Sequence, residues 1–76
     1  MEEDLIRYIA ENLVNNPDEI TLNTQKKGRT TILELHVAPD DMGRVIGKSG
    51  RVANAMRALL RASSNQSRAR FVLEIE

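Results

Sequence analysis

A glycine-rich segment with one lysine and one serine is the part of the sequence best suited to phosphate chemistry. Residues 43–50 are Gly-Arg-Val-Ile-Gly-Lys-Ser-Gly. A nucleotide-hydrolysing phosphate loop requires four residues between its first glycine and the Gly-Lys-Ser triplet, but Met42 occupies the position of that first glycine. The dinucleotide-binding pattern requires a glycine at position 45, which is Val45. Nucleotide hydrolysis is therefore not expected.

The remaining interpretation is a Gly-x-x-Gly turn between two helices. Two glycines let another backbone approach closely, and the helix that follows presents free N–H groups to an anion. Lys48 and Arg51 would add positive charge, Ser49 a hydroxyl, and Arg44 a cation at the start of the turn. The alternative is a plain connection between two helices, in which the glycines only relieve strain.

Other residues that could do chemistry have simpler explanations. His36 shares a strand face with Glu34 and is expected to be a surface histidine. Ser49 has no assured general base, so we expect no nucleophilic catalysis. Asp40 and Asp41 are expected to be acids at a helix N-terminus rather than a metal pair. The sequence thus indicates no catalytic residue, no metal site and no cofactor.

The charged residues are segregated along the chain. Residues 1–41 hold nine acids and four bases, whereas residues 42–70 hold seven bases and no acid. Such a local field can recruit a polyanion even though the formal net charge is zero. Two bases of this segment, Arg57 and Arg61, lie four residues apart and are interpreted as a solvated helix face, with an extended nucleic-acid surface as the alternative.

Size and composition exclude several classes of protein. The chain has 76 residues and no cysteine, which excludes disulfide scaffolds, cysteine-zinc sites and thiol chemistry. The N-terminus is acidic, unlike a signal peptide. No apolar run approaches the roughly 20 residues of a membrane span. A cytoplasmic protein of one small domain, with no membrane span, is expected.

The first half of the chain predicts a helix and a hairpin. Apolar residues form one helical stripe over 2–14, which ends before Pro17. Alternating patterns predict strands over 20–25 and 30–38, joined by a turn at 26–29.

The second half predicts two helices and a last strand. Pro39 begins a short helix, which Gly43 and Gly47 are expected to bracket. A longer helix is predicted over 51–62, a polar loop over 63–67 and a strand over 68–76. The buried stripe of the longer helix is expected to contain Val52, Met56, Leu59 and Leu60. The order α-β-β-α-α-β predicts an α+β fold, with a three-stranded sheet and helices packed on one face.

The segment Val45-Ile46-Gly47-Lys48-Ser49-Gly50-Arg51, in this order of elements, resembles the KH domain, an RNA-binding module with a GXXG loop. Over nearly the whole chain, the sequence is similar to the small bacterial KhpA family of type II KH proteins. Ala53 departs from the pattern, because many KH domains carry a larger aliphatic residue there. The resemblance implies one KH domain over 1–76, with a narrow groove whose apolar wall contains Val45, Ile46, Val37 and Val52. The implied RNA-binding residues are Arg44, Val45, Ile46, Gly47, Lys48, Ser49, Gly50 and Arg51.

The expected function is non-catalytic binding of single-stranded RNA, in post-transcriptional regulation or as an RNA chaperone. With few aromatics, base stacking cannot be the main binding device. The resemblance also implies a homodimer and a heterodimer with a larger KH-containing protein (KhpB, also called Jag or EloR). It further implies a link to cell shape, cell wall organization, elongation and division. A second hypothesis is a protein-interaction adaptor whose basic helix docks a partner. A third, a small nucleotide-binding enzyme, is disfavoured by the missing glycine at position 42.

Overall fold

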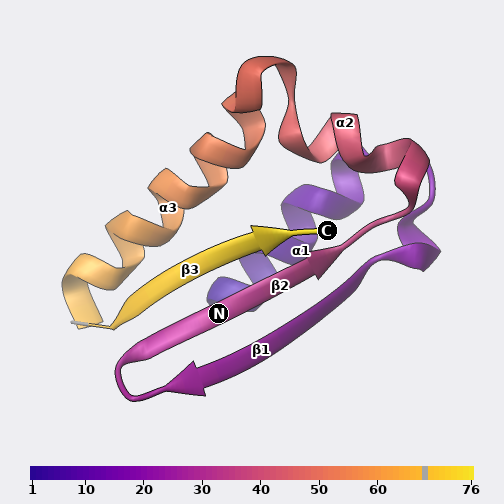
Figure 1. The fold of residues 1–76 in the computed structure, drawn as a ribbon. Coiled ribbons are helices and arrows are strands. Elements are labelled where there is room, and N and C mark those ends of the chain that lie inside the picture. Colours follow the sequence, from indigo (N-terminus) through magenta and orange to yellow (C-terminus); the bar gives the residue numbers. More distant parts are fainter. Residues whose placement is uncertain (68) are drawn as a thin grey trace.

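The computed structural model describes residues 1–67 and 69–76, with the side chains of 64–67 left aside. Figure 1 shows a three-stranded sheet with α1 behind it and α3 running beside β3. The helices are α1 (Glu2–Leu13), α2 (Met42–Ile46) and α3 (Arg51–Ser67), and the strands are β1 (Thr21–Lys27), β2 (Thr30–His36) and β3 (Arg70–Ile75). Short 3-10 turns lie at Pro17–Glu19, Pro39–Asp41 and Lys48–Gly50. The predicted α+β fold and order of elements are confirmed.

The sheet is mixed, with strand order β1-β2-β3. β1 and β2 form the predicted antiparallel hairpin, in which Thr24 pairs with Leu33. β3 pairs with β2 in parallel, and Leu33 pairs with Leu73. Parallel strands need a long crossover, and α2 and α3 supply it. The loop between these two helices therefore lies beyond the ends of β2 and β3 (Figure 1).

The core lies between the helices and one face of the sheet. Leu33 and Leu35 of β2 are buried, and Leu73 of β3 joins them. Ile6 and Ala10 of α1 and Val45, Met56 and Leu60 of α2 and α3 complete the cluster. Burial of such side chains supplies most of the stability of a small domain.

The predicted helical stripes were too wide. In α3, Met56 and Leu60 are buried and Val52 is half-buried, but Leu59 is 46% exposed. The buried face of α3 is centred on Ala53, Met56 and Leu60, and Leu59 lies one residue, about 100°, away from Leu60. Leu5 and Leu13 of α1 are likewise exposed at the margin of their stripe.

Several predicted boundaries were wrong. α3 continues to Ser67, so the predicted loop over 63–67 is helical; polar residues there include no proline or glycine to end the helix. Gly43 lies inside α2, and only Gly47 ends it. β1 extends to Lys27, which leaves a shorter turn, and β2 ends at His36 rather than at 38. The predicted start of the last strand at Arg68 lies outside the described residues; β3 begins at Arg70.

Candidate nucleic-acid interface

The glycine loop has an unusual backbone, with three left-handed residues among four. Gly47, Ser49 and Gly50 have φ values of 78°, 57° and 77°. The Gly47 N–H donates to Gly43 O at 2.9 Å, and the Gly50 N–H donates to Gly47 O at 3.1 Å. These bonds end α2 and begin α3 within one tight turn. A loop built in this way places Lys48 and Ser49 at its tip, where both are exposed.

Gly47 is the residue that packing fixes most strictly. A Cβ atom at this position would lie 2.5 Å from Val52 Cγ2 and 2.9 Å from the Val52 backbone nitrogen. Real Cβ contacts of that length essentially never occur. Gly50 meets only Asn54 Nδ2 at 3.7 Å, so its positive φ, rather than lack of space, favours glycine there. We call this loop a built turn, because packing requires glycine at position 47 and a positive φ favours glycine at position 50. It is therefore more than a plain linker between helices.

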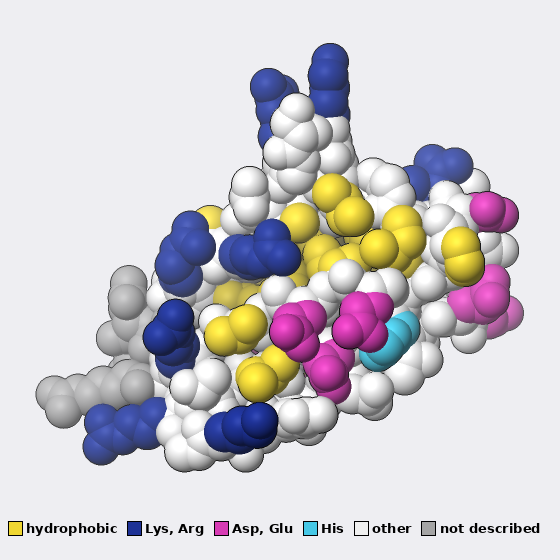
Figure 2. Space-filling model, viewed as in Figure 1, with side chains coloured by type: hydrophobic (Ala, Val, Ile, Leu, Met, Phe, Trp, Pro, Cys, Tyr) yellow, Lys and Arg dark blue, Asp and Glu magenta, His cyan; other side chains and the backbone are white. Residues whose placement is uncertain are grey.

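The cations predicted around the loop are not equivalent. Lys48 and Arg51 are exposed, and Figure 2 shows Lys and Arg side chains projecting from the loop region at the top of the molecule. Arg44, in contrast, turns back along α2, and its Nε lies 3.3 Å from Asp41 Oδ1. Among the loop cations, those that no described acid pairs with are therefore Lys48 at the tip and Arg51 on the α3 side.

The apolar residues predicted beside the loop divide into two kinds. Val45 has no exposed surface and belongs to the core, so its side chain supports the loop from beneath. Val37, Ile46 and Val52 are half-buried. We call these three residues the apolar strip. Figure 2 shows hydrophobic side chains gathered below the loop, between α2 and the ends of β2 and β3. Such a surface accommodates flat apolar groups next to the loop cations.

Arg57 departs from the predicted solvated helix face. It is half-buried, and its Nη2 donates to the Leu73 carbonyl oxygen of β3 at 3.3 Å. Its Nη1 donates to Asn54 Oδ1, one turn earlier in α3, at 3.4 Å. Arg61 is exposed. The spacing of the two arginines suggested a shared role. The packing of α3 against β3 gives them different surroundings, and this difference cannot be seen in the sequence.

Asp41 performs a role that sequence reasoning missed. Its side chain is 1% exposed, and it makes no capping hydrogen bond to α2. Instead it accepts hydrogen bonds from the backbone N–H groups of Asn15 and Asn16 and from Asn16 Nδ2, each at 3.0 Å. The Asn15 backbone N–H is the main cause that lowers the pKa of Asp41 below its usual value. The bonds span about 25 residues, so no local pattern could have revealed them.

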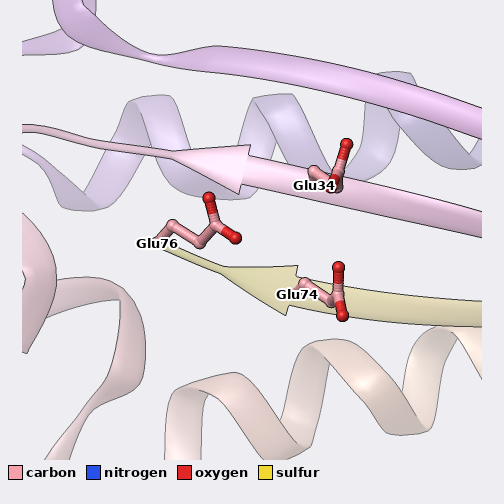
Figure 3. A group of neighbouring side chains, drawn as sticks. All are labelled: Glu34, Glu74 and Glu76. Carbon is pink, nitrogen blue, oxygen red and sulfur yellow. The ribbon is translucent and has the colours of Figure 1, made fainter.

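Three acids lie together on the open face of the sheet, away from the loop cations. Carboxylate oxygens of Glu34, Glu74 and Glu76 lie within 4.8 Å of one another. Figure 3 shows these neighbouring side chains, from β2, from β3 and from the residue that follows β3. His36 Nδ1 lies 3.4 Å from Glu76 Oε2, and the histidine side chain is 40% exposed, which confirms its predicted place on a sheet face. In Figure 2, hydrophobic side chains lie between a group of acidic side chains and the Lys and Arg side chains at the top of the molecule.

Comparison with models of protein families shows which family the chain belongs to. The family model "KhpA/KhpB, KH domain" matches residues 3–75. The chain belongs to this family. Its members are non-catalytic KH domains. The three-stranded sheet and the helix pair around the glycine loop are consistent with the KH-like fold.

Relatives match over nearly their whole length. An RNA-binding protein KhpA from Treponema pallidum is 51% identical over 99% of this chain and 94% of its own. The KhpA protein of Caldanaerobacter subterraneus is 44% identical over 95% of this chain and 96% of its own. Among solved structures, an Era variant of Aquifex aeolicus bound to GDP and aluminium fluoride superposes with a TM-score of 0.61 at 15% identity, over 97% of this chain and 29% of that one. The last comparison shows similarity of fold alone.

Within the described residues, no helix is both long enough and apolar enough to cross a membrane.

Proposed function

We propose that residues 1–76 form one KH domain that binds single-stranded RNA without catalysis. The observation that carries the proposal is the built turn at Gly47–Gly50, which holds exposed Lys48 and Ser49 beside a half-buried apolar strip. A nucleotide chain has this same division between charged phosphates and flat bases. The relatives named RNA-binding protein KhpA support the same conclusion.

In this proposal, the phosphates lie against the backbone of Gly47 to Gly50, with Lys48 and Arg51 supplying charge. The bases point toward the apolar strip of Val37, Ile46 and Val52. The contribution of Arg44 is smaller, because Asp41 already pairs with its guanidinium. Affinity is modest and falls with added salt, since a few phosphate contacts carry much of it.

Fluorescence anisotropy with a labelled single-stranded RNA pool, at two salt concentrations, tests the proposal. The double variant Lys48→Asp/Ser49→Asp should abolish binding, because it places two negative charges in the phosphate seat. The matched control Arg7→Asp/Asn12→Asp makes the same change of net charge on exposed residues of α1 and should retain most of the binding. Equal binding by wild type and the folded loop variant would exclude the loop as the RNA site.

The cellular role that we propose follows from family membership. The domain acts in the cytoplasm as a post-transcriptional regulator or RNA chaperone, as a homodimer and with a larger KH-containing protein (KhpB, Jag or EloR). Cell elongation and division are the processes that it serves. Co-purification of a tagged chain from cells, followed by identification of bound RNA and protein, tests this role.

A specific observation favours a protein-interaction adaptor as the second candidate. Leu59 is 46% exposed in the middle of the basic helix α3, and an exposed large apolar side chain can anchor a partner. Leu59→Glu should then abolish partner binding or self-association in light-scattering measurements, while RNA binding persists. If Lys48→Asp/Ser49→Asp abolishes partner binding and Leu59→Glu does not, the hypothesis that Leu59 forms the adaptor surface is wrong.

A further inference from the structure

Arg57 lies on α3, about two turns beyond the glycine loop. It follows Gly50 by seven residues on α3, which places it about 10 Å along the helix axis. Its side chain is half-buried and is turned toward β3 rather than toward solvent. In the proposed complex, the phosphates of an RNA strand lie on the loop and its bases extend along α3. One of these bases would therefore contact the Arg57 guanidinium.

The backbone of β3 explains why the guanidinium is held there. β3 is the outer strand of the sheet, so one of its edges has no strand beside it. The N–H groups of Arg70 and Glu76 donate toward β2, to Arg29 O and Leu35 O. Because backbone groups alternate in direction along a strand, Leu73 directs its carbonyl to the outer edge. Arg57 reaches across and donates to that carbonyl at 3.3 Å.

Arg57 retains capacity for a ligand. Its two hydrogen bonds, to Leu73 O and Asn54 Oδ1, are 3.3 and 3.4 Å long, slightly longer than is usual for N–H···O bonds and therefore weak. A guanidinium has five N–H donors, and the others have no partner among the residues that the structure describes. Over the same part of the chain, Arg57 forms no ion pair. The side chain is thus oriented but neither saturated nor neutralised.

We infer that Arg57 reads the identity of a base in the bound strand, an inference that rests on the proposed RNA site. The planar fork of a guanidinium matches a base edge with two neighbouring acceptors. Guanine offers O6 and N7, and the Watson–Crick edge of cytosine offers O2 and N3. On the edges of adenine and uracil, donors alternate with acceptors, so two neighbouring acceptors are absent. Such an edge accepts only one hydrogen bond from the guanidinium fork. Arg57 therefore favours guanine or cytosine at its position.

Four labelled eight-nucleotide RNAs test this inference. Each is oligouridine with its two central positions left as uridine or replaced by cytidine, guanosine or adenosine. Wild type should bind the cytidine or the guanosine oligomer most tightly, and the comparison of the two identifies the base. Arg57→Gln should weaken binding of the preferred oligomer roughly tenfold and remove the preference, without changing the dependence on salt.

Matched variants separate base reading from a general loss of charge. Arg61→Gln removes the same charge one turn along α3 and should weaken all four RNAs equally. Arg57→Lys keeps the charge but not the planar fork, so it should lose the preference while retaining general binding. Arg57→Lys also carries the test if thermal melting shows that Arg57→Gln does not fold.

Two results would overturn the inference alone. One is an Arg57→Gln variant that weakens all four RNAs by the same factor and lowers the salt slope by about one, as a phosphate contact would. The other is a wild type that binds all four equally while still depending on Lys48 and Ser49. A wild type that binds none of them overturns the RNA site as well.

Discussion

At the scale of single residues, the backbone of the loop decides which side chains are permitted. Gly47 and Ser49 both have positive φ, but only at Gly47 does packing also exclude a side chain. Gly47 has no room for a Cβ atom because Val52 packs directly against it. Ser49 tolerates the left-handed conformation at some cost in energy, as residues at functional sites often do. The sequence motif correctly identified the glycines, but the strain at Ser49 is visible only in the structure.

The contrast between two glycines gives a sharp prediction. Gly47→Ala should lower the free energy of unfolding by about 1–3 kcal/mol, because the new methyl group must displace Val52 and the backbone must keep a φ of 78°. Gly43→Ala is the control: nothing lies within 4 Å of its Cβ position, and alanine inside a helix should stabilise by roughly 0.5–1 kcal/mol. Urea denaturation measures both. An alanine at position 47 that leaves stability unchanged would refute the packing argument.

At the scale of elements, contacts between segments far apart in the sequence hold the loop in place. Asp41 joins the end of α1 to the start of α2 through Asn15 and Asn16. The Ser63 hydroxyl donates to Glu2 Oε2 and so joins α3 to α1; this bond is the main cause that lowers the pKa of Glu2. The glycine loop lies between two helices that are both anchored to α1.

The Asp41 contact predicts how stability depends on pH. Because the folded-state pKa of Asp41 is lowered, mainly by the Asn15 N–H, the stabilisation is present above its unfolded value, near 3.9, and is lost as pH falls through the lower folded value. Asp41→Asn should melt at a lower temperature than wild type at pH 7. The difference between the two should shrink below about pH 4.

Melting curves from pH 2 to 7 check this expectation. Asp40→Asn, at the exposed neighbouring position, is the control and should resemble wild type at every pH. A deficit of Asp41→Asn that stays constant down to pH 2 would show that the carboxylate charge does not contribute.

The order of elements was predictable from local patterns, whereas their outer surfaces were not. Alternation over β2 and the proline and glycine positions are local properties of the chain, and they located the sheet and the loop. Three features depend on how α3, β3 and α1 pack: the exposure of Leu59, the contact of Arg57 with Leu73, and the hydrogen bonds of Asp41. Those contacts join residues 16 or more positions apart, so no sequence period contains them. For the same reason, Val45 was assigned to a binding wall although it is core.

At the scale of the whole molecule, a formal net charge of zero conceals two poles. The basic pole is the glycine loop with α3, and the acidic pole, on the open face of the sheet, is the cluster of Glu34, Glu74 and Glu76. In the proposed complex, RNA that approaches the apolar strip is attracted by the basic pole and repelled by the acidic pole. If RNA binds at the proposed site, this field should direct the phosphates to the loop side and away from the open face of the sheet.

Neutralising the acidic cluster should strengthen RNA binding and make the bound RNA less confined to the glycine loop. The triple variant Glu34→Gln/Glu74→Gln/Glu76→Gln should raise affinity about threefold at low salt, and the gain should disappear near 0.5 M salt, where the Debye length is only about 4 Å. The control Glu3→Gln/Asp4→Asn/Glu11→Gln removes as many charges from exposed positions of α1 and should have a smaller effect. If both triple variants bind RNA equally tightly, total charge governs binding and the cluster has no directing role. If the cluster variant alone gains affinity and binds without dependence on Lys48, then the acidic cluster is what confines RNA to the glycine loop.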